Sequence, residues 1–277
     1  MMTTNKNQVN VFREPGILHP TLLVGWETQD VGNVGKEVIN YIQEQCGGEE
    51  VAELDPMGFF AFEGAIFKDN LIQIPHSKFK ECTEEKLLMF SSDEPMYEKY
   101  SFLTTVLDFC VEQYGVGSLY TFNGSPTPMA HTEERNMFLV FNRETLREEF
   151  PENEYIEHIS WEGPPAMSTY LLWAALKKGI SGITVWVEVP FYLSSVKDPL
   201  AVKCVLSFLD EHLNLGINLQ QLDEEIDRQE ELLLELTEAN PEVREMLEKL
   251  EREEELEENE QIFLSKAVYD YLQKNNS

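Results

Sequence analysis

The segment from residue 180 to residue 213 constrains the fold of this 277-residue chain more than any other. A short apolar, β-branched run from about Ile180 to Val189 is typical of a strand that is buried on both faces. Pro190 ends the strand, because proline has no amide hydrogen to donate to a sheet. A polar loop follows, and then an amphipathic helix from about Leu200 to Leu213. This order of strand, loop and helix forms half of a βαβ unit and predicts an α/β fold.

Three other predicted strands also end in polar loops that lead into a helix or a turn. They are Thr21–Glu27, Lys86–Ser91 and Ser118–Phe122. If these strands and the one ending at Val189 are parallel, their carboxyl ends meet at one edge of the sheet, where open α/β sheets bind ligands. We therefore expect an α/β domain over residues 1–218 with a largely parallel or mixed sheet.

The spacing of apolar residues predicts the other helices and strands of this domain. Helices are predicted at Val34–Cys46, Tyr97–Tyr114, Glu144–Phe150 and Ala166–Lys177, and further strands at Val51–Asp55, Phe138–Phe141 and Tyr155–Ile159. The segments Phe59–Phe62 and Asn70–Pro75 indicate a hairpin or an edge excursion with a turn at Lys68–Asn70.

The chain changes character at about Asn218, where a narrow helical seam begins. Its apolar positions are Leu219, Leu222, Ile226, Leu233 and Leu236. Asn240 and Pro241 predict the cap and first residue of another helix. Between Gln221 and Glu260 the chain has 18 acidic and four basic residues. We expect an acidic helical extension over residues 219–277, which is either a solvated surface or an arm that binds a partner or another subunit.

Charge and cysteine content exclude several classes of protein. The net charge of −30 argues against nucleic-acid binding and against binding to anionic membranes. The N-terminal residues are polar, and the longest apolar run, near Ile183–Leu193, is interrupted by Glu188, so we expect a cytoplasmic protein without a membrane span. The four cysteines are far apart and form no C-x-x-C pair, which predicts reduced thiols rather than disulfides or a zinc site.

Known catalytic motifs are incomplete in this chain. The segment Gly32-Asn-Val-Gly-Lys36 lies between a strand and a helix, but two residues rather than four separate its glycines and Glu37 follows the lysine, so it is not a phosphate-binding loop. Its glycines are expected to let the helix start close to the sheet. The histidines form no H-E-x-x-H pair, and there is no G-x-S-x-G motif, so neither a cofactor nor a metal is predicted.

The residues after the four strand ends are the candidates for a ligand pocket. Four carboxylates fall there, and they could share protons as acid and base, or Asp30 and Asp93 could instead cap helices. His131 lies in a loop beyond a strand end and could equally be an exposed loop residue. The predicted pocket consists of Glu27, Asp30, Asn33, Asp93, Glu94, Asn123, His131 and Tyr192.

Four motifs in this order resemble the proteasome assembly chaperone family, the bacterial and archaeal relatives of the second eukaryotic assembly chaperone. They are Leu22-Leu-Val-Gly-Trp-Glu with Asp30, Gly32 and Asn33; Leu87-Leu-Met-Phe-Ser-Ser-Asp-Glu-Pro95; Gly124-Ser-Pro-Thr-Pro with His131-Thr132; and Val185-Trp-Val-Glu-Val-Pro-Phe-Tyr192 with Asp198-Pro199. Together they cover residues 20 to 220.

The resemblance implies a three-layer α/β/α domain similar to the nucleoside phosphorylase and hydrolase folds. It also implies self-association, often as a trimer or tetramer, and a role in helping proteasome subunits to assemble. Two features depart from the family: the chain ends Leu272-Gln-Lys-Asn-Asn-Ser277 instead of in a hydrophobic-Tyr-any tail, and its acidic extension is long.

Two hypotheses from different classes follow. The first is a non-catalytic interaction protein of the chaperone type with a protein client. The second is an enzyme of the hydrolase, phosphorylase or carboxylate–amine ligase type that uses the strand-end pocket. A solvated, shallow surface with an exposed apolar patch would favour the first hypothesis, and an ordered ligand in the pocket would favour the second.

Overall fold

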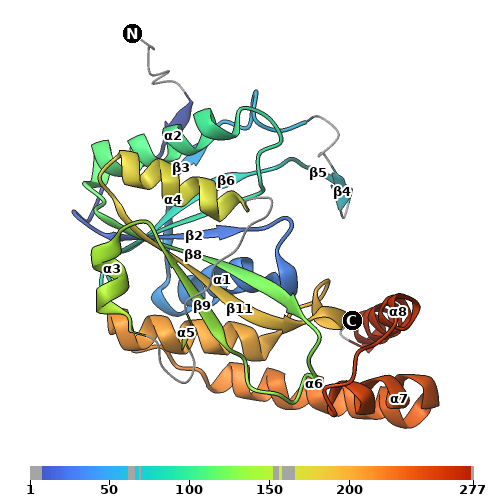
Figure 1. Ribbon diagram of the computed structural model, residues 1–277. Coiled ribbons are helices and arrows are strands. Elements are labelled where there is room, and N and C mark those ends of the chain that lie inside the picture. Colours follow the sequence, from blue (N-terminus) through green and yellow to red (C-terminus); the bar gives the residue numbers. More distant parts are fainter. Residues whose placement is uncertain (1–7, 62–65, 69, 152–155, 158–165, 276–277) are drawn as a thin grey trace.

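A nine-stranded mixed sheet organises the part of the chain that the computed structural model describes, which comprises residues 8–61, 66–68, 70–151, 156–157 and 166–275 (Figure 1). In sheet order its strands are β1 (Val9–Val11), β3 (Glu49–Leu54), β6 (Ser77–Cys82), β7 (Leu87–Ser92), β2 (Thr21–Trp26), β8 (Ser118–Thr127), β11 (Ser181–Pro190), β9 (Met137–Phe141) and β10 (Ile156–Glu157). A separate hairpin consists of β4 (Ile66–Lys68) and β5 (Leu71–Gln73).

The sheet is mixed and its centre is parallel, which agrees with the prediction of a largely parallel or mixed sheet. Strands β7, β2, β8 and β11 are adjacent and run in the same direction. Antiparallel neighbours flank them, β6 beside β7 and β9 beside β11. The four predicted strand ends therefore share one edge of the sheet.

Helices cover both faces of this sheet. Helices α2 (Lys99–Phe109) and α4 (Met167–Lys177) lie on one face, and α1 (Val34–Cys46) and α5 (Pro199–Leu213) lie on the other (Figure 1). Alternate side chains of β2 feed the two layers, since Leu22 and Val24 join the α2–α4 core while Leu23 joins the α1–α5 core. A short helix, α3 (Glu144–Glu149), follows β9. The α/β fold and its three layers are confirmed.

The first turn of α1 lies directly on the strand backbones. A β-carbon added to Gly25 on β2 would lie 2.5 Å from the carbonyl oxygen of Gly35, and one added to Gly124 on β8 would lie 2.2 Å from that of Val31. Gly32 has a φ of +67° and faces Val189. The glycines of this loop thus bring the helix close to the sheet, as the sequence predicted.

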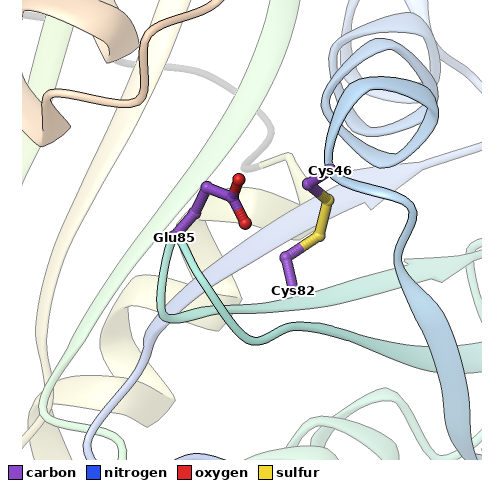
Figure 2. Close-up of side chains that lie close together, drawn as sticks. All are labelled: Cys46, Cys82 and Glu85. Carbon is purple, nitrogen blue, oxygen red and sulfur yellow. A yellow bond between two sulfur atoms is a disulfide. The ribbon is translucent and has the colours of Figure 1, made fainter.

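Two of the cysteines are joined, which corrects the prediction of four free thiols. Cys46 at the end of α1 and Cys82 at the end of β6 form a disulfide with a Cα–Cα distance of 5.9 Å (Figure 2). Cys110 and Cys204 are free. The prediction relied on sequence spacing, but the fold brings together two cysteines from elements that are 36 residues apart.

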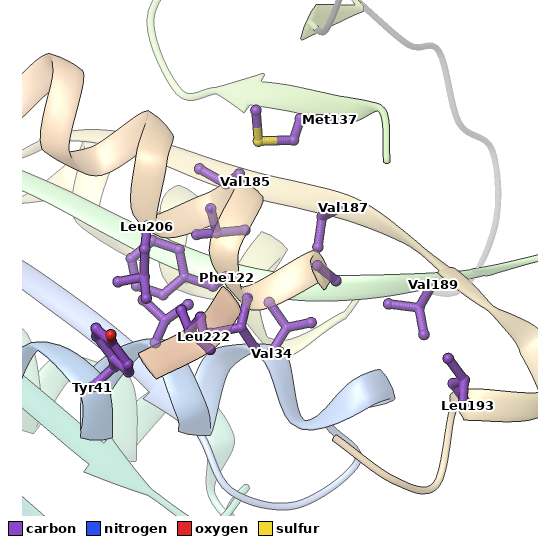
Figure 3. Close-up of a cluster of buried hydrophobic side chains, with 14 of the residues drawn as sticks. Val34, Tyr41, Phe122, Met137, Val185, Val187, Val189, Leu193, Leu206 and Leu222 are labelled. Atoms are coloured by element: carbon purple, nitrogen blue, oxygen red, sulfur yellow. The ribbon is translucent and has the colours of Figure 1, made fainter. Parts of the chain in front are cut away.

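Three helices follow the α/β layers and pack on the α1–α5 side. They are α6 (Gln220–Ala239), α7 (Pro241–Leu250) and α8 (Glu258–Asn275). The seam residue Leu222 lies in the same apolar cluster as Val34 and Leu206 (Figure 3). The side chain of Asn240 caps α7, as predicted, because it accepts hydrogen bonds from the backbone N–H groups of Glu242 and Val243 at 3.1 and 3.4 Å. None of the described helices is long and apolar enough to cross a membrane.

Two strands of the sheet are absent from the sequence prediction. Strand β1 is a short, exposed edge strand that pairs with β3. Strand β6 buries Ser77 and Phe79 and directs Lys78 and Lys80 to its less buried face, so its alternation is regular but only weakly apolar. The predicted strand Tyr155–Ile159 is described only at 156–157, and parts of the predicted hairpin also lie outside the described residues.

We predict that Gly25→Ala will destabilise the protein by about 1–3 kcal/mol, because the new methyl group has to displace the backbone of α1. Urea unfolding followed by circular dichroism measures this change. Gly117→Ala is the matched control, since nothing lies within 4 Å of the added atom. Equal stability of the two variants would contradict the close contact between helix and sheet.

The boundary at residue 218 stays a prediction, which truncation would test. A chain ending at Asn218 keeps the whole sheet and the four helices on its faces, so we expect it to unfold cooperatively. Its free energy of unfolding should be lower, because the buried apolar contacts of Leu222 and Leu233 are lost. An unfolded product would show that residues 219–277 complete the core.

Candidate functional site

A polar cleft of about 980 Å³ opens where β2 and β7 end. Glu27 follows β2, Asp93 follows β7, and His76 precedes β6. The Oε1 atom of Glu27 lies 3.0 Å from Nε2 of His76, and the backbone N–H of His76 donates to Oδ2 of Asp93 at 3.4 Å. Three neighbouring strands thus fix one histidine between two carboxylates.

The walls of the cleft combine charges of both signs with apolar groups. Glu94 lines the cleft together with Glu27 and Asp93, and its backbone N–H donates to the Thr28 hydroxyl at 2.8 Å. Lys78 and Lys80 project from β6 into the same cleft, and Phe60, Ile74 and Met96 supply its apolar rim. Such a surface can bind a polar ligand or a segment of another protein chain.

The ionisation of these groups follows their surroundings. Burial raises the pKa values of Asp93 and Glu94 above the ordinary values of these carboxyl groups. Burial also opposes ionisation of Glu27, but the hydrogen bond and charge of His76 outweigh it and lower the pKa of Glu27. The hydrogen bond that His76 donates to the Glu27 carboxylate raises the pKa of His76 in turn. Glu27 and His76 therefore form an ion pair over part of the acidic pH range.

Asp30 and Asn33 lie at the start of α1. The carboxylate of Asp30 accepts hydrogen bonds from the backbone N–H groups of Gly35 and Lys36 at 3.1 and 2.9 Å, so it caps the helix. Burial raises the pKa of Asp30 to about 6 in spite of these bonds. Asn33 has a left-handed backbone and lines a second, smaller hollow beside α6 and α8. Neither residue lines the cleft of Glu27.

His131 and Tyr192 form a separate pair near the start of α5. The Tyr192 hydroxyl oxygen accepts from the His131 backbone N–H at 2.6 Å and lies 3.0 Å from its Nδ1. Burial and the positive charge of Arg135 lower the pKa of His131 to about 4, so its ring is neutral near pH 7. The side chains of Arg135 and Asp198 are 1% and 0% exposed and form a buried ion pair with an Nε–Oδ2 distance of 3.2 Å.

Asn123 lies apart from both groups. Its side-chain amide donates to the Ser168 hydroxyl at 3.0 Å, which attaches β8 to the first turn of α4. Of the eight predicted pocket residues, the structure brings together Glu27, Asp93 and Glu94 in the cleft and His131 and Tyr192 in a second group. Their binding of a ligand stays a prediction.

Sequence reasoning missed His76 and Arg135. His76 joins the cleft only because β6 lies beside β7, and β6 was not predicted. Arg135 is a single arginine in a polar loop, and its burial depends on a contact with Asp198, 63 positions along the chain. Neither feature has a local motif that would reveal it.

A further group of side chains lies at the opposite, amino-terminal edge of the parallel strands. Ligand atoms of Cys46, Cys82 and Glu85 all lie within 4.8 Å of one another there. Among the residues that the structure describes, this is where sulfur and carboxylate atoms gather closely enough to hold a metal ion.

Comparison with known proteins relates this geometry to a family. The model of the PAC2 family matches residues 22–237. No curated protein matches the chain.

Solved structures share the fold at low sequence identity. The chain is similar to a protein of unknown function from Corynebacterium glutamicum, with 19% identity, a TM-score of 0.74 and coverage of 89% of this chain and 96% of that one. It is similar to PbaB, an archaeal proteasome activator from Pyrococcus furiosus, with 23% identity, a TM-score of 0.69 and coverage of 82% and 97%. A proteasome-assembly chaperone homologue from Mycobacterium tuberculosis has 17% identity, a TM-score of 0.69 and coverage of 78% and 94%.

We predict that His76→Gln will destabilise the protein more at about pH 5.5 than at about pH 8. The raised pKa of His76 gives stability that is present below about pH 6.5 and is lost as pH rises through the folded value. The lowered pKa of Glu27 gives stability that is present above about pH 4.5 and is lost as pH falls through the folded value.

The difference should stay below about 1 kcal/mol, because the pair is partly exposed. Thermal unfolding of wild type, His76→Gln, Glu27→Gln and the double variant at both pH values measures it. A His76→Gln effect that is the same at both pH values would rule out the ion pair.

Proposed function

Because the chain belongs to the PAC2 family, we propose that it is a non-catalytic protein of the assembly-chaperone type, which acts by binding other protein chains. Two similar solved structures support the proposal, since one is named as a proteasome activator and the other as a proteasome-assembly chaperone homologue. Its client would accordingly be a subunit of a proteasome-type assembly.

The observation that carries the proposal is an exposed aromatic surface on the outer side of α2 and α4. We call it the α2–α4 face; its exposed residues are Tyr100 on α2, Tyr170, Trp173 and Leu176 on α4, and Met96 and Tyr97 just before α2. Tyr100 and Trp173 remain 54% and 47% exposed, and their rings contact each other at a centroid distance of 5.4 Å. Large aromatic side chains on a surface are typical of protein interfaces, where they bury much area with few rotatable bonds.

The two helical layers differ in what covers them. Helices α6, α7 and α8 pack against the α1–α5 side, whereas the outer side of α2 and α4 carries no other described helix (Figure 1). Monomeric proteins rarely leave a large contiguous apolar patch in water. We therefore propose that a second copy of this chain covers the α2–α4 face, and that the protein is a homo-oligomer, a trimer or tetramer as the resemblance implied.

The cleft supplies polar contacts next to this face. Met96 lines the cleft and lies shortly before the first residue of α2, so the cleft adjoins the start of that helix. We propose that Glu27, Asp93 and Glu94 contact a polar segment of the client there. The cleft is wide and open, which suits a segment of protein chain better than an enclosed small molecule.

The hydrogen-bond partners of the histidine side chains do not favour the enzyme hypothesis. Within the described residues, His19 and His212 bond to backbone carbonyls, His76 to a carboxylate and His131 to a tyrosine. A serine, threonine or cysteine nucleophile is activated by a base within hydrogen-bond reach, and none of these four hydrogen bonds joins a histidine to such a residue. Burial also raises the pKa of Cys204 to about 11, which keeps that thiol protonated.

We predict that Trp173→Ser will shift the protein from an oligomer toward the 32.0 kDa chain, because the substitution removes the largest side chain from the proposed contact. Size-exclusion chromatography with light scattering at micromolar concentration measures the mass. Tyr269→Ser on α8 is the control, since its ring is similarly exposed and lies outside the α2–α4 face. A monomeric wild type, or equal masses for the two variants, would contradict the proposal.

The chaperone role requires its own measurement. Purified proteasome-type subunits are mixed with the wild type, with Trp173→Ser or with Asp93→Asn, and the yield of assembled rings is followed by native mass spectrometry. We expect the wild type to increase the rate or yield of assembly and both variants to do so less. No effect of the wild type would remove the assembly role while leaving the oligomer prediction to its own test.

A further inference from the structure

Cys46, Cys82 and Glu85 come from three elements that the fold holds together. Cys46 is the last residue of α1, Cys82 is the last residue of β6, and Glu85 lies in the turn between β6 and β7. Their two sulfurs and a carboxylate oxygen lie within 4.8 Å of one another, and Figure 2 shows Glu85 beside the disulfide. None of these three residues lines the polar cleft or belongs to the α2–α4 face.

The backbone positions the three side chains independently of the bond between the sulfurs. Gly47 ends α1 in a left-handed conformation, with its N–H bonded to the Gln43 carbonyl at 2.9 Å. Cys82 pairs with Leu87 in the antiparallel ladder of β6 and β7, which fixes the connecting turn that carries Glu85. A Cα–Cα distance of 5.9 Å lies within the range of a disulfide and also lets two thiolates approach one metal ion.

We propose that Cys46, Cys82 and Glu85 bind one Zn²⁺ ion when the disulfide is reduced. A dithiol reductant supplies two electrons and two protons, so that the S–S bond breaks, two thiols form and the reductant becomes a disulfide. Zn²⁺ then displaces both thiol protons to solvent and gains two thiolates and the Glu85 carboxylate as ligands. A water molecule takes the fourth position of the tetrahedron, as in zinc sites with three protein ligands.

The donor atoms favour zinc over the hard cations Mg²⁺ and Ca²⁺. Two sulfurs and one carboxylate oxygen suit a borderline ion with tetrahedral preference, whereas Mg²⁺ and Ca²⁺ require mostly oxygen ligands. The last carbonyl groups of α1 point toward its C-terminal end and add partial negative charge near Cys46, which favours a cation. The two thiolates and the carboxylate carry three negative charges against the two positive charges of Zn²⁺. The complex therefore has a net charge of −1 and no excess positive charge.

Exposure permits both the entry of the ion and the water ligand. Cys82 is 1% exposed, but Cys46 and Glu85 are each partly exposed. One side of the group is therefore accessible to solvent while the other is packed against the sheet. A buried ligand on a rigid strand and two accessible ligands provide a site with an entry path.

The disulfide form and the zinc-bound form of this site would both connect the end of α1 to the end of β6. Cys46 and Cys82 enclose the segment that carries β3, His76 and one wall of the cleft. A disulfide and a bound zinc ion both tie the ends of this segment together, whereas the reduced, metal-free protein does not. Zinc would thus preserve that wall under reducing conditions.

Zinc binding by the full-length protein tests the proposal. The chain is reduced with a phosphine under anaerobic conditions, and Zn²⁺ is titrated in competition with a chromophoric chelator. Native mass spectrometry counts the ions, and Co²⁺ substitution reports thiolate ligands through charge-transfer absorption. We expect one ion per reduced chain, none per oxidised chain, and affinity lowered by at least about tenfold in Cys46→Ser, Cys82→Ser and Glu85→Gln.

Matched variants separate the site from other ligands. Glu84→Gln, at the exposed neighbouring residue, and Cys204→Ser, at a free cysteine, should bind zinc like the wild type. Circular dichroism checks that each variant is folded, and Glu85→Gln leaves both cysteines in place. Absence of zinc from the reduced wild type, or equal affinity of Glu85→Gln and Glu84→Gln, would overturn the proposal.

Discussion

The direct contact between the first turn of α1 and the strands beneath it determines how the carboxyl edge is built. Gly25 and Gly124 leave no side chain between the helix and the sheet, and the carbonyl groups of Gly35 and Val31 occupy that space. Asp30 then caps the helix, and the loop containing Gly32 bonds to the loop before α5 through Ser194 and Asp198. Any side chain at these glycines would lift the helix and separate the strand-end loops that form the candidate site.

The buried ion pair of Arg135 and Asp198 is the second constraint on that edge. Two charges without water cost free energy unless their remaining hydrogen-bonding groups are satisfied. Here Arg135 also donates to the backbone carbonyls of His131 and Glu133, and Asp198 accepts from the first turn of α5. The pair therefore attaches the loop before β9 to α5, and a variant that removes one partner leaves the other charge buried.

Sequence patterns predicted the α/β class and most elements of the sheet, because burial on both faces leaves continuous apolar runs and because glycine and proline mark the element ends. The three layers were implied by the resemblance to the family. The seam from Leu222 to Leu236 and the cap at Asn240 have the same local origin. What could not be predicted depends on contacts between distant segments. Strand β6 has lysines at alternate positions, where a strand buried on both faces has apolar residues, so the strand was not predicted. His76, which precedes it, was therefore not placed in the cleft. The Cys46–Cys82 pair was missed because spacing rules describe only cysteines that are close in sequence.

The pairing of β8 with β11 has a consequence for synthesis of the chain. All ten residues of β8 are in register with β11, from Ser118 with Ser181 to Thr127 with Pro190. A ribosome adding roughly 5–20 residues per second needs about 3–13 s to produce the second strand after the first. During that interval β8 has only β2 as a partner, and its other edge presents unpaired backbone groups. The nascent chain therefore passes through a stage in which half of its sheet offers an open edge, and the loop that carries Arg135 is made before Asp198, with which it forms the buried ion pair.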